Sequence, residues 1–423
     1  MRRYLSPFFS VFFVLTFMGF ASATNGDNLM AVGPIARSMG GVGVAAPQDA
    51  ISAVFANPAA MCFGPYCPGT EVNFGGTLFM PKMDATVTAS DGSVISASGD
   101  KKIYAIPAIG LSVPITNQWR FGLAAYGVSG LGVDYRNTSI ESATLPGSGG
   151  TFPLVQGEYT QLQIMKFSPS IAYQVNNNLS LGLGVQIDYA NLDLHHGSSF
   201  NYAIGAQLGA LYKATDTITV GVTYITPQEV DHKNVLATPM GAKDLKLESP
   251  QQIGVGISVE PIRNALLVEV DGRWINWSSA TGYDDFDWKD QWVLALGAQY
   301  KPTKQLALRV GYNVANNQVR EHDNFVGFNG TSNPPTTFVQ GIPFPNYYYE
   351  TFRIIGFPAF IKQHMSFGIG YEISNKFALN AGYTHGFKST ISETGTSPTS
   401  PAPTTISSSL TEDSIEFGFT WRF

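Results

Sequence analysis

Three charged residues alternate along one segment of the sequence, in a pattern that suits either ion pairing or ligand binding. Glu269, Asp271 and Arg273 are spaced two apart, so they share one face if the segment is a β-strand. Arg309 holds a polar position in a later segment. Buried charges are usually paired, so these side chains are predicted to pair with one another or with N-terminal charges. The N-terminal candidates are Arg37 and Asp49. In the alternative interpretation, Arg273 or Arg309 binds a ligand carboxylate.

The sequence gives little support for catalysis. His195-His196 and Ser198-Ser199 lie close together, and Ser–His pairs act as nucleophile and base in hydrolases. However, adjacent strand residues point to opposite faces, so proximity in sequence does not form such a pair. No phosphate-binding loop or metal-ligand spacing is present. We therefore predict no catalytic residue, no metal and no cofactor.

Two cysteines, Cys62 and Cys67, enclose the tetrapeptide Phe-Gly-Pro-Tyr. The glycine and proline permit a tight loop, and an oxidising compartment would favour a disulfide. The alternative is a pair of unpaired buried thiols. A metal site is not indicated, because no second Cys or His pair lies nearby.

The composition argues against a soluble protein. The chain has 423 residues, of which 13% are charged and 13% aromatic, whereas soluble domains carry about 25% charged residues. A helical membrane protein needs apolar runs of about 20 residues, and the sequence has one such stretch, at its N-terminus. Short amphipathic segments rich in glycine and aromatic residues are typical of a transmembrane β-barrel. The net charge of −6 argues against nucleic-acid binding.

Residues 1–23 are predicted to be a signal peptide. Arg2 and Arg3 precede an apolar stretch at residues 11–20, and Ala21-Ser22-Ala23 matches a cleavage site. Cleavage would make Thr24 the first mature residue. The alternative is an uncleaved anchor helix, for which the apolar run is short.

The last ten residues give the clearest strand pattern. One face is apolar and aromatic, made of Ile415, Phe417, Phe419, Trp421 and Phe423. The other is small or charged, made of Glu416, Gly418, Thr420 and Arg422. The first face suits lipid and the second a polar lumen. As an edge strand of a soluble sandwich, this segment would need a second sheet to cover the aromatic face.

The same alternation recurs upstream, and the links between segments alternate between short and long. Alternating segments include residues 179–189, 291–300, 365–373 and 377–383. Short links are expected at residues 117–118, 176–178, 215–216, 261–264, 302–305 and 374–375. Longer links are expected near residues 84–100, 136–156, 195–199, 231–246, 279–287, 316–360 and 389–410. This pattern predicts an all-β, antiparallel up-and-down barrel of about 14 strands over residues 70–423.

A barrel of this size encloses a lumen that strand side chains alone do not fill. Residues 24–69 have no place in the strand count, and residues 30–61 within them are rich in small residues without sustained alternation. We therefore predict that residues 24–69 form an N-terminal plug, or hatch, inside the barrel.

Several motifs resemble the FadL/TodX-type family of outer-membrane transporters over essentially the whole mature chain. In the plug they are Ala36-Arg37-Ser38, Asp49-Ala50 and Asn57-Pro58-Ala59. In the barrel they are residues 126–132, 168–173 and 274–278, together with the terminal Phe423. The segment from Cys62 to Cys67 is not part of the family pattern.

The resemblance implies a 14-stranded barrel with a hatch that takes up long-chain fatty acids or other hydrophobic molecules. It also implies sideways release through a gap beside a kinked third strand. Here that kink would fall among Gly127, Gly130 and Gly132. Glycines this close together suggest a bulge, although ordinary strand glycines in a curved barrel are the alternative.

A second candidate site lies in the long link at residues 325–360, which is rich in aromatic residues. Phe344, Tyr347, Tyr348, Tyr349 and Phe352 would form an apolar capture groove on the outer side. The alternative is a loop packed on itself and on the barrel rim.

The sequence therefore predicts a monomeric barrel in a Gram-negative-type outer membrane that transports hydrophobic molecules passively. Its expected partners are the hydrophobic ligand, outer-membrane lipid and the barrel-assembly machinery, with no nucleic acid. The alternatives are a structural or adhesive surface barrel and a general diffusion porin.

Overall fold

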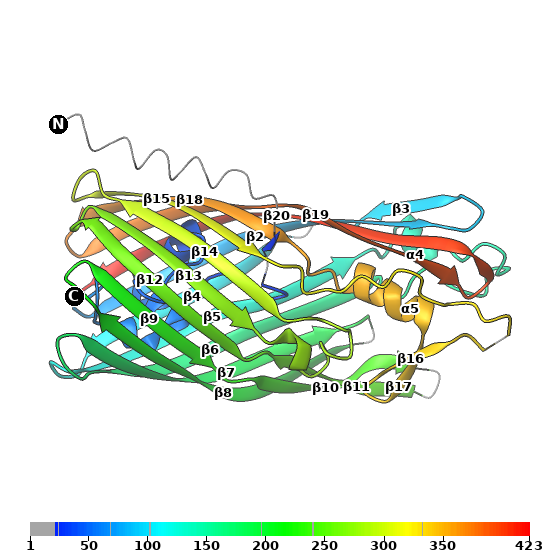
Figure 1. Ribbon diagram of the computed structural model, residues 1–423, viewed down its shortest axis with the longest axis horizontal. Helices are drawn as coiled ribbons and strands as arrows, with labels where there is room; N and C mark the ends of the chain where they lie inside the picture. The colour runs from blue at the N-terminus through cyan, green and yellow to red at the C-terminus, as the bar shows by residue number, and fades with distance from the viewer. Residues whose placement is uncertain are drawn as a thin grey trace.

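The structure is a computed structural model that describes residues 22–23, 25–67, 69–100, 103–195, 197–238, 241–331 and 333–423. The predicted signal peptide lies outside the described residues except for Ser22 and Ala23. Over the described chain, fourteen antiparallel strands form one closed barrel (Figure 1). In chain order they are β2 (Glu71–Thr88), β4 (Tyr104–Pro114), β5 (Trp119–Asp134), β6 (Tyr159–Gln174), β7 (Leu179–Asp193), β8 (Ser198–Lys213), β9 (Ile218–Ile225), β12 (Gln252–Ile262), β13 (Leu266–Ile275), β14 (Gln291–Tyr300), β15 (Leu306–Ala315), β18 (Lys362–Ser374), β19 (Phe377–Ser397) and β20 (Ser400–Arg422).

The barrel closes because its first and last strands pair along their whole length. The ladder between β2 and β20 runs from the Glu71–Arg422 pair to the Thr88–Thr405 pair. Closure removes the free sheet edges, whose unpaired backbone groups have no water partners in hydrocarbon. The predicted fold class and strand number are confirmed.

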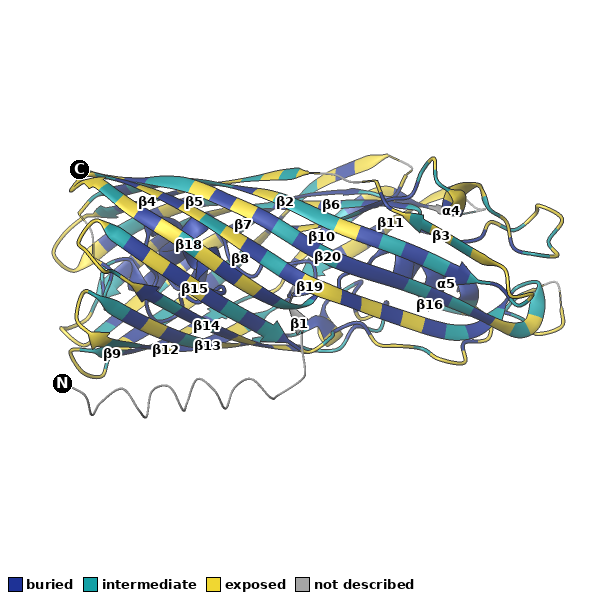
Figure 2. Ribbon diagram, turned by 90° about the horizontal axis from the view of Figure 1, so that it is seen from above, coloured by how far each residue is buried: buried dark blue, intermediate teal, exposed yellow. Residues whose placement is uncertain are grey.

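The two-residue period of the sequence becomes the two faces of the barrel wall. On β7, Leu181, Leu183 and Val185 are exposed on the outside, whereas Ser180 and Gln186 are buried inside. Exposed and buried residues alternate in the same way along β15, β18 and β19 (Figure 2). The outer face is apolar because it meets lipid, and the inner face is polar because it meets the plug.

Short links lie at one end of the barrel and long links at the other, as predicted. The long links carry β3 (Val94–Ser98), α4 (Ser139–Ser142), β10 (Gln228–Thr238), β11 (Gly241–Ser249), the 3-10 helix η3 (Trp277–Ser279), β16 (Thr336–Val339), β17 (Ile342–Pro345), α5 (Asn346–Thr351) and the π-helix η4 (Phe352–Gly356). Figure 1 shows β3, α4, α5 and the β10–β11 and β16–β17 hairpins gathered at this outer end. None of the described helices is both long and apolar enough to cross a membrane.

One predicted loop is wrong. Residues 389–410 do not form a polar loop, because β19 and β20 continue as a paired hairpin to Ser397 and Ser400. Ile391 and Ile406 are buried in this extension. The serine- and threonine-rich composition suggested a loop, but the ladder pairs its backbone, and burial of these isoleucines stabilises it.

The plug, here residues 25–67, lies inside the inner end of the barrel, drawn in blue in Figure 1. It contains α2 (Pro34–Ser38), α3 (Ala50–Ala56) and the 3-10 helix η2 (Pro58–Ala60). A two-residue strand, β1 (Ser22–Ala23), precedes it and pairs with β18. At Gly311 any Cβ atom would collide with the backbone of Gly40, so the plug approaches the wall as closely as backbone allows.

Two capping side chains shape the plug helices. The Asp49 carboxylate accepts a hydrogen bond of 2.7 Å from the backbone amide of Ser52, which begins α3. The Asn57 side chain accepts from the amide of Ala59 at 3.1 Å and begins η2. Shortly after η2, Cys62 and Cys67 form a disulfide, at the point where the chain leaves the plug for β2.

Candidate functional site

Carboxylates of the barrel wall bind the plug through its backbone. On β13, Asp271 accepts hydrogen bonds from the amides of Gly43 at 2.9 Å and Val44 at 3.0 Å. Glu269 accepts from the next two amides, those of Ala45 at 2.7 Å and Ala46 at 2.9 Å. Hydrogen bonds to a charged acceptor are stronger than neutral ones, so these two side chains hold one turn of the plug against the wall.

Arginines complete this attachment. Arg273 donates to the carbonyl of Met30 at 2.9 Å and also to that of Gly41. Arg37, on α2, forms an ion pair of 2.8 Å with Glu416 of β20. Charged side chains of the barrel therefore bind the backbone of the plug, and one charged side chain of the plug binds a side chain of the barrel.

The predicted cluster is thus only partly brought together. Glu269, Asp271 and Arg273 share one inward face, and in the plug they bind backbone groups, whereas Arg37 pairs with Glu416 of β20. Arg309 lies apart and donates to Gln299 at 2.7 Å and Asn380 at 2.9 Å. The sequence did not indicate backbone amides as partners, because that requires knowing where the plug lies.

The barrel wall is interrupted between β4 and β5. Their ladder runs from the Pro114–Arg120 pair and stops at the Ala108–Tyr126 pair. The ladder between β5 and β6 shifts register between Gly127 and Ser129. Beyond this bulge β5 pairs with β6 alone, while the start of β4 pairs with β2. The bulge lies in the third strand, among the glycines singled out in the sequence.

The start of the plug covers the inside of this interruption. The amide of Leu29 donates to the carbonyl of Val128 at 2.9 Å, and the amide of Gly130 donates to the carbonyl of Asp27 at 3.1 Å. These bonds satisfy backbone groups that the bulge removes from the β4–β5 ladder. The hydroxyl group of Tyr283 also donates to the Asp27 carboxylate. The segment is thus held by hydrogen bonds to β5 and to an outer loop and forms no part of the β4–β5 ladder, so its displacement breaks no strand pairing of the barrel.

A cavity of about 460 Å³ lies directly behind the interruption. Its walls come from the plug start, from β2, β4, β5, β6 and β20, and from the chain after η4. The apolar lining residues are Leu29, Phe79, Pro81, Met83, Ile103, Ala105, Ile106, Pro107, Leu131, Leu162, Ile164, Met165, Pro358, Ala359 and Leu410. A mostly apolar cavity of this size is typical of a site for a small hydrophobic ligand.

The aromatic residues of the outer loop are packed rather than open. The hydroxyl groups of Tyr347, Tyr348 and Tyr349 donate to backbone carbonyls of neighbouring loops at 2.7–2.9 Å. Phe344, Tyr349 and Phe352 line a cavity of about 70 Å³, which is small for a hydrocarbon. The capture groove is therefore closed in this structure, and its role in capture stays a prediction.

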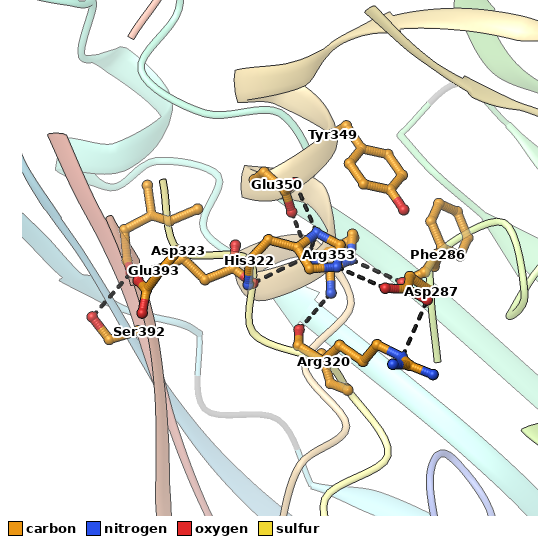
Figure 3. Close-up of polar contacts among 12 residues, drawn as sticks. Phe286, Asp287, Arg320, His322, Asp323, Tyr349, Glu350, Arg353, Ser392 and Glu393 are labelled. Atoms are coloured by element: carbon orange, nitrogen blue, oxygen red, sulfur yellow. Dashed lines mark hydrogen bonds and ion pairs between the residues drawn. The ribbon is translucent and has the colours of Figure 1, made fainter. Parts of the chain in front are cut away.

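A partly buried charge cluster, here called the outer cluster (Asp287, His322, Glu350, Arg353 and Glu393), holds the outer loops together (Figure 3). Arg353 of η4 forms ion pairs with Glu350 and, at 3.1 Å, with Glu393 of β19. His322 contacts Glu350 at 2.9 Å and Asp287 at 2.8 Å. Atoms of His322, Glu350 and Glu393 are close enough to hold a metal ion, but Arg353 already supplies a positive charge to both carboxylates.

Sequence reasoning missed this cluster. Glu350 and Arg353 are spaced three apart on one helical stretch, which is a pairing signal. The aromatic residues around them indicated a hydrophobic capture groove instead of an ion pair. Arg353 is fully buried, so its charge must be paired.

Comparison with known proteins finds a family that part of the chain resembles. A family model described as "Outer membrane protein transport protein (OMPP1/FadL/TodX)" matches residues 12–202. This part of the chain, which includes the plug and the first strands of the barrel, is therefore similar to the FadL/TodX family. The barrel is accordingly an outer-membrane barrel, as the sequence predicted. No curated protein matches the chain significantly.

Solved structures support the same fold. A FadL homologue from Pseudomonas aeruginosa has 15% sequence identity and a TM-score of 0.68, covering 94% of this chain and 100% of its own. The toluene transporter TodX from P. putida has 18% identity and a TM-score of 0.63, covering 93% and 99%. The toluene transporter TbuX from Ralstonia pickettii has 17% identity and a TM-score of 0.63, with the same coverage.

Replacing Asp271 with alanine is expected to loosen the plug. The amides of Gly43 and Val44 would lose their acceptor, at a cost of about 1–3 kcal/mol. Hydrogen exchange of residues 39–49 should accelerate by about tenfold or more. Asp216→Ala, which removes an exposed acid at the short-link end, is the control. Equal exchange in Asp271→Ala and the wild type would contradict the attachment.

The outer cluster is expected to weaken as pH rises. Hydrogen bonding to Glu350 raises the pKa of His322, with a smaller contribution from Asp287 and opposition from burial and Arg353. A raised folded-state pKa means full stabilisation below the unfolded value of about 6.5 and loss as pH rises through the folded value. Hydrogen exchange of residues 346–356, corrected for intrinsic rates, should therefore accelerate from pH 6 to pH 9.

His322→Gln should reduce this pH dependence without abolishing it, because burial raises the pKa of Glu393 to about 7, so that this carboxyl group also titrates between pH 6 and pH 9. His385→Gln, which alters an ion pair with Asp413 elsewhere on the barrel, should leave it intact. Identical pH profiles for the wild type and His322→Gln would refute the assignment.

Proposed function

We propose that this protein carries hydrophobic small molecules across the outer membrane passively and releases them sideways between β4 and β5. The class includes long-chain fatty acids and aromatic hydrocarbons. The observation that carries the proposal is the coincidence of three features: an interrupted ladder, an apolar cavity behind it, and a plug segment over it that forms no part of the ladder. Each feature alone has a structural explanation, but together they form a path from lumen to lipid.

The proposed route has three steps. A ligand reaches the cavity from the outer loops, where Phe344, Tyr349 and Phe352 provide apolar surface. Occupancy competes with residues 27–29 of the plug for the inner side of β5. Displacement of that segment opens the interruption, and the ligand leaves into the apolar phase of the bilayer. Burial of apolar surface drives each transfer, so no energy coupling is needed.

The proposal also assigns a role to each segment of the chain and to the membrane. Residues 24–69 act as the plug, residues 70–423 as the barrel, and residues 1–23 as a cleaved signal peptide. Outer-membrane lipid is the receiving phase, and the barrel-assembly machinery recognises the strand that ends at Phe423. The barrel functions as a monomer, because its own plug fills its own lumen.

Relatives with known ligands fit this proposal. TodX and TbuX are described as toluene transporters. CymD, described as a monoaromatic hydrocarbon channel, has 18% identity and a TM-score of 0.58. These structures share the fold with this chain, and the cavity described here is of the apolar character that such ligands require.

The alternatives predict different behaviour. A diffusion porin would conduct ions steadily, whereas the buried plug should give little current in planar bilayers. A purely adhesive barrel would have no use for an apolar cavity behind an interrupted wall. His195 contacts Glu158 and Ser198 contacts Asp193, and His196 lies outside the described residues.

Gly130→Trp tests the sideways exit. Gly130 is exposed, and an added Cβ would meet just one atom, the Leu162 carbonyl oxygen at 3.7 Å. An indole there should obstruct the interruption and slow uptake of labelled toluene about tenfold or more. Gly130 also lines the cavity, so ligand affinity is measured beside uptake, and a loss of uptake that exceeds any loss of affinity indicates an obstructed exit.

Gly272→Trp is the matched control. Gly272 is also exposed, on β13, and an added Cβ would have no atom within 4 Å. Both variants should assemble, because neither indole clashes with the wall. Normal uptake by Gly130→Trp, or equal losses in the two variants, would refute exit between β4 and β5.

A further inference from the structure

The charged side chains that line the large cavity are all acidic. They are Asp27, from the plug start, and Glu412, from β20, and the described residues that line the cavity include no lysine, arginine or histidine. Asp27 is bound to β5 through its carbonyl. The neighbouring strands β5, β4, β2 and β20 follow one another in the wall, so the two carboxyl groups stand at opposite flanks of the cavity.

Glu412 accepts a hydrogen bond from a histidine of the neighbouring wall. Nε2 of His364 lies 3.2 Å from Oε2 of Glu412. Nδ1 of the same ring is buried and has no hydrogen-bond partner among the described residues. A doubly protonated ring would place an unpaired charged donor at Nδ1, which is costly. The ring is therefore neutral and donates from Nε2, so Glu412 is held as an acceptor.

Asp27 is also held as an acceptor. The hydroxyl group of Tyr283 donates to its carboxylate. Burial raises the pKa of Asp27 to about 6, so the carboxylate is still mostly ionised above pH 7. Both flanks of the cavity therefore present hydrogen-bond acceptors.

The arginines nearest to this part of the lumen cannot serve as counter-ions for a ligand. Arg37 is paired with Glu416, and Arg273 donates to carbonyls of the plug. Arg309 donates to Gln299 and Asn380 on the far side of the plug attachment. None of the three lines the cavity. A carboxylate ligand would meet two acidic groups and, among the described lining residues, no basic side chain.

We propose that Asp27 and Glu412 make the cavity selective for uncharged hydrophobic molecules that carry a hydrogen-bond donor, such as long-chain alcohols and phenols, and exclude carboxylates. The inference rests on the proposed function and narrows its ligand class. Like charges in a site of low dielectric repel strongly, whereas a hydroxyl group donates to a carboxylate in a charge-assisted hydrogen bond. The apolar tail of the ligand contacts the apolar lining residues equally well whether its head group is a hydroxyl group or a carboxylate.

Equilibrium dialysis of the full-length protein in detergent tests this selectivity. The ligands are dodecan-1-ol, methyl dodecanoate and dodecanoate, with empty micelles as the blank. A pH of about 8.5 keeps dodecanoate and both acids ionised. The wild type should bind dodecan-1-ol at least about tenfold more tightly than dodecanoate, equivalent to about 1.4 kcal/mol. The ester, which is neutral but lacks a donor, should lie between them.

Two neutral, nearly isosteric variants assign the effect. Glu412→Gln and Asp27→Asn should each raise dodecanoate affinity several-fold and lower dodecan-1-ol affinity. Glu321→Gln removes the same charge from an exposed loop position that does not line the cavity, so it should change neither. Retained ester binding and an unchanged heat-dependent shift in gel mobility show that each variant is folded.

The outcomes separate the selectivity from transport itself. Equal binding of alcohol and dodecanoate by the wild type, or an unchanged ratio in both variants, overturns the selectivity while leaving the proposed function standing. Failure of the wild type to bind any of the three ligands overturns both. A changed ratio in Glu321→Gln as well would attribute the effect to overall charge and overturn the role of the cavity acids.

Discussion

The need to hydrogen-bond every backbone group in hydrocarbon governs this molecule. A strand edge facing lipid leaves amides and carbonyls without partners, at a cost of several kcal/mol each. The chain meets this requirement by pairing β2 with β20 along their whole length. The bulge in β5 is the exception, and there two backbone groups of the plug replace part of the missing ladder. The weak place in the wall is thus closed by a segment that is not itself part of the wall.

The replacement of ladder hydrogen bonds by hydrogen bonds to the plug connects the fold to transport. A wall whose neighbouring strands are hydrogen-bonded along their whole length could not open without breaking that ladder. Residues 27–29 form no part of the wall, so a ligand can take their place beside β5. The rest of the plug is held much more firmly. Glu269 and Asp271 bind four consecutive amides, and Arg37 pairs with Glu416. Because stability is unevenly distributed, the plug start can move while the remainder keeps the lumen blocked.

The outer end has its own anchor. Buried Arg353 joins η4 to β19, and His322 joins the preceding loop to the same cluster. The chain following η4 contributes Pro358 and Ala359 to the wall of the cavity. Charge pairing in the outer loops therefore positions part of the hydrophobic site. This explains why an aromatic loop segment contains a fully buried arginine.

The sequence by itself determined the barrel, its approximate strand count, the short turns and the presence of a plug. It did so because a two-residue period is local and survives in every strand, as in residues 179–189. It also singled out the bulge glycines and the inward face of Glu269 and Asp271. The tertiary structure decided what these side chains bind, that residues 389–410 pair as a hairpin, and that Glu412 faces the same cavity as Asp27. Those contacts join segments hundreds of residues apart, and their energies depend on burial and distance, which no local pattern encodes.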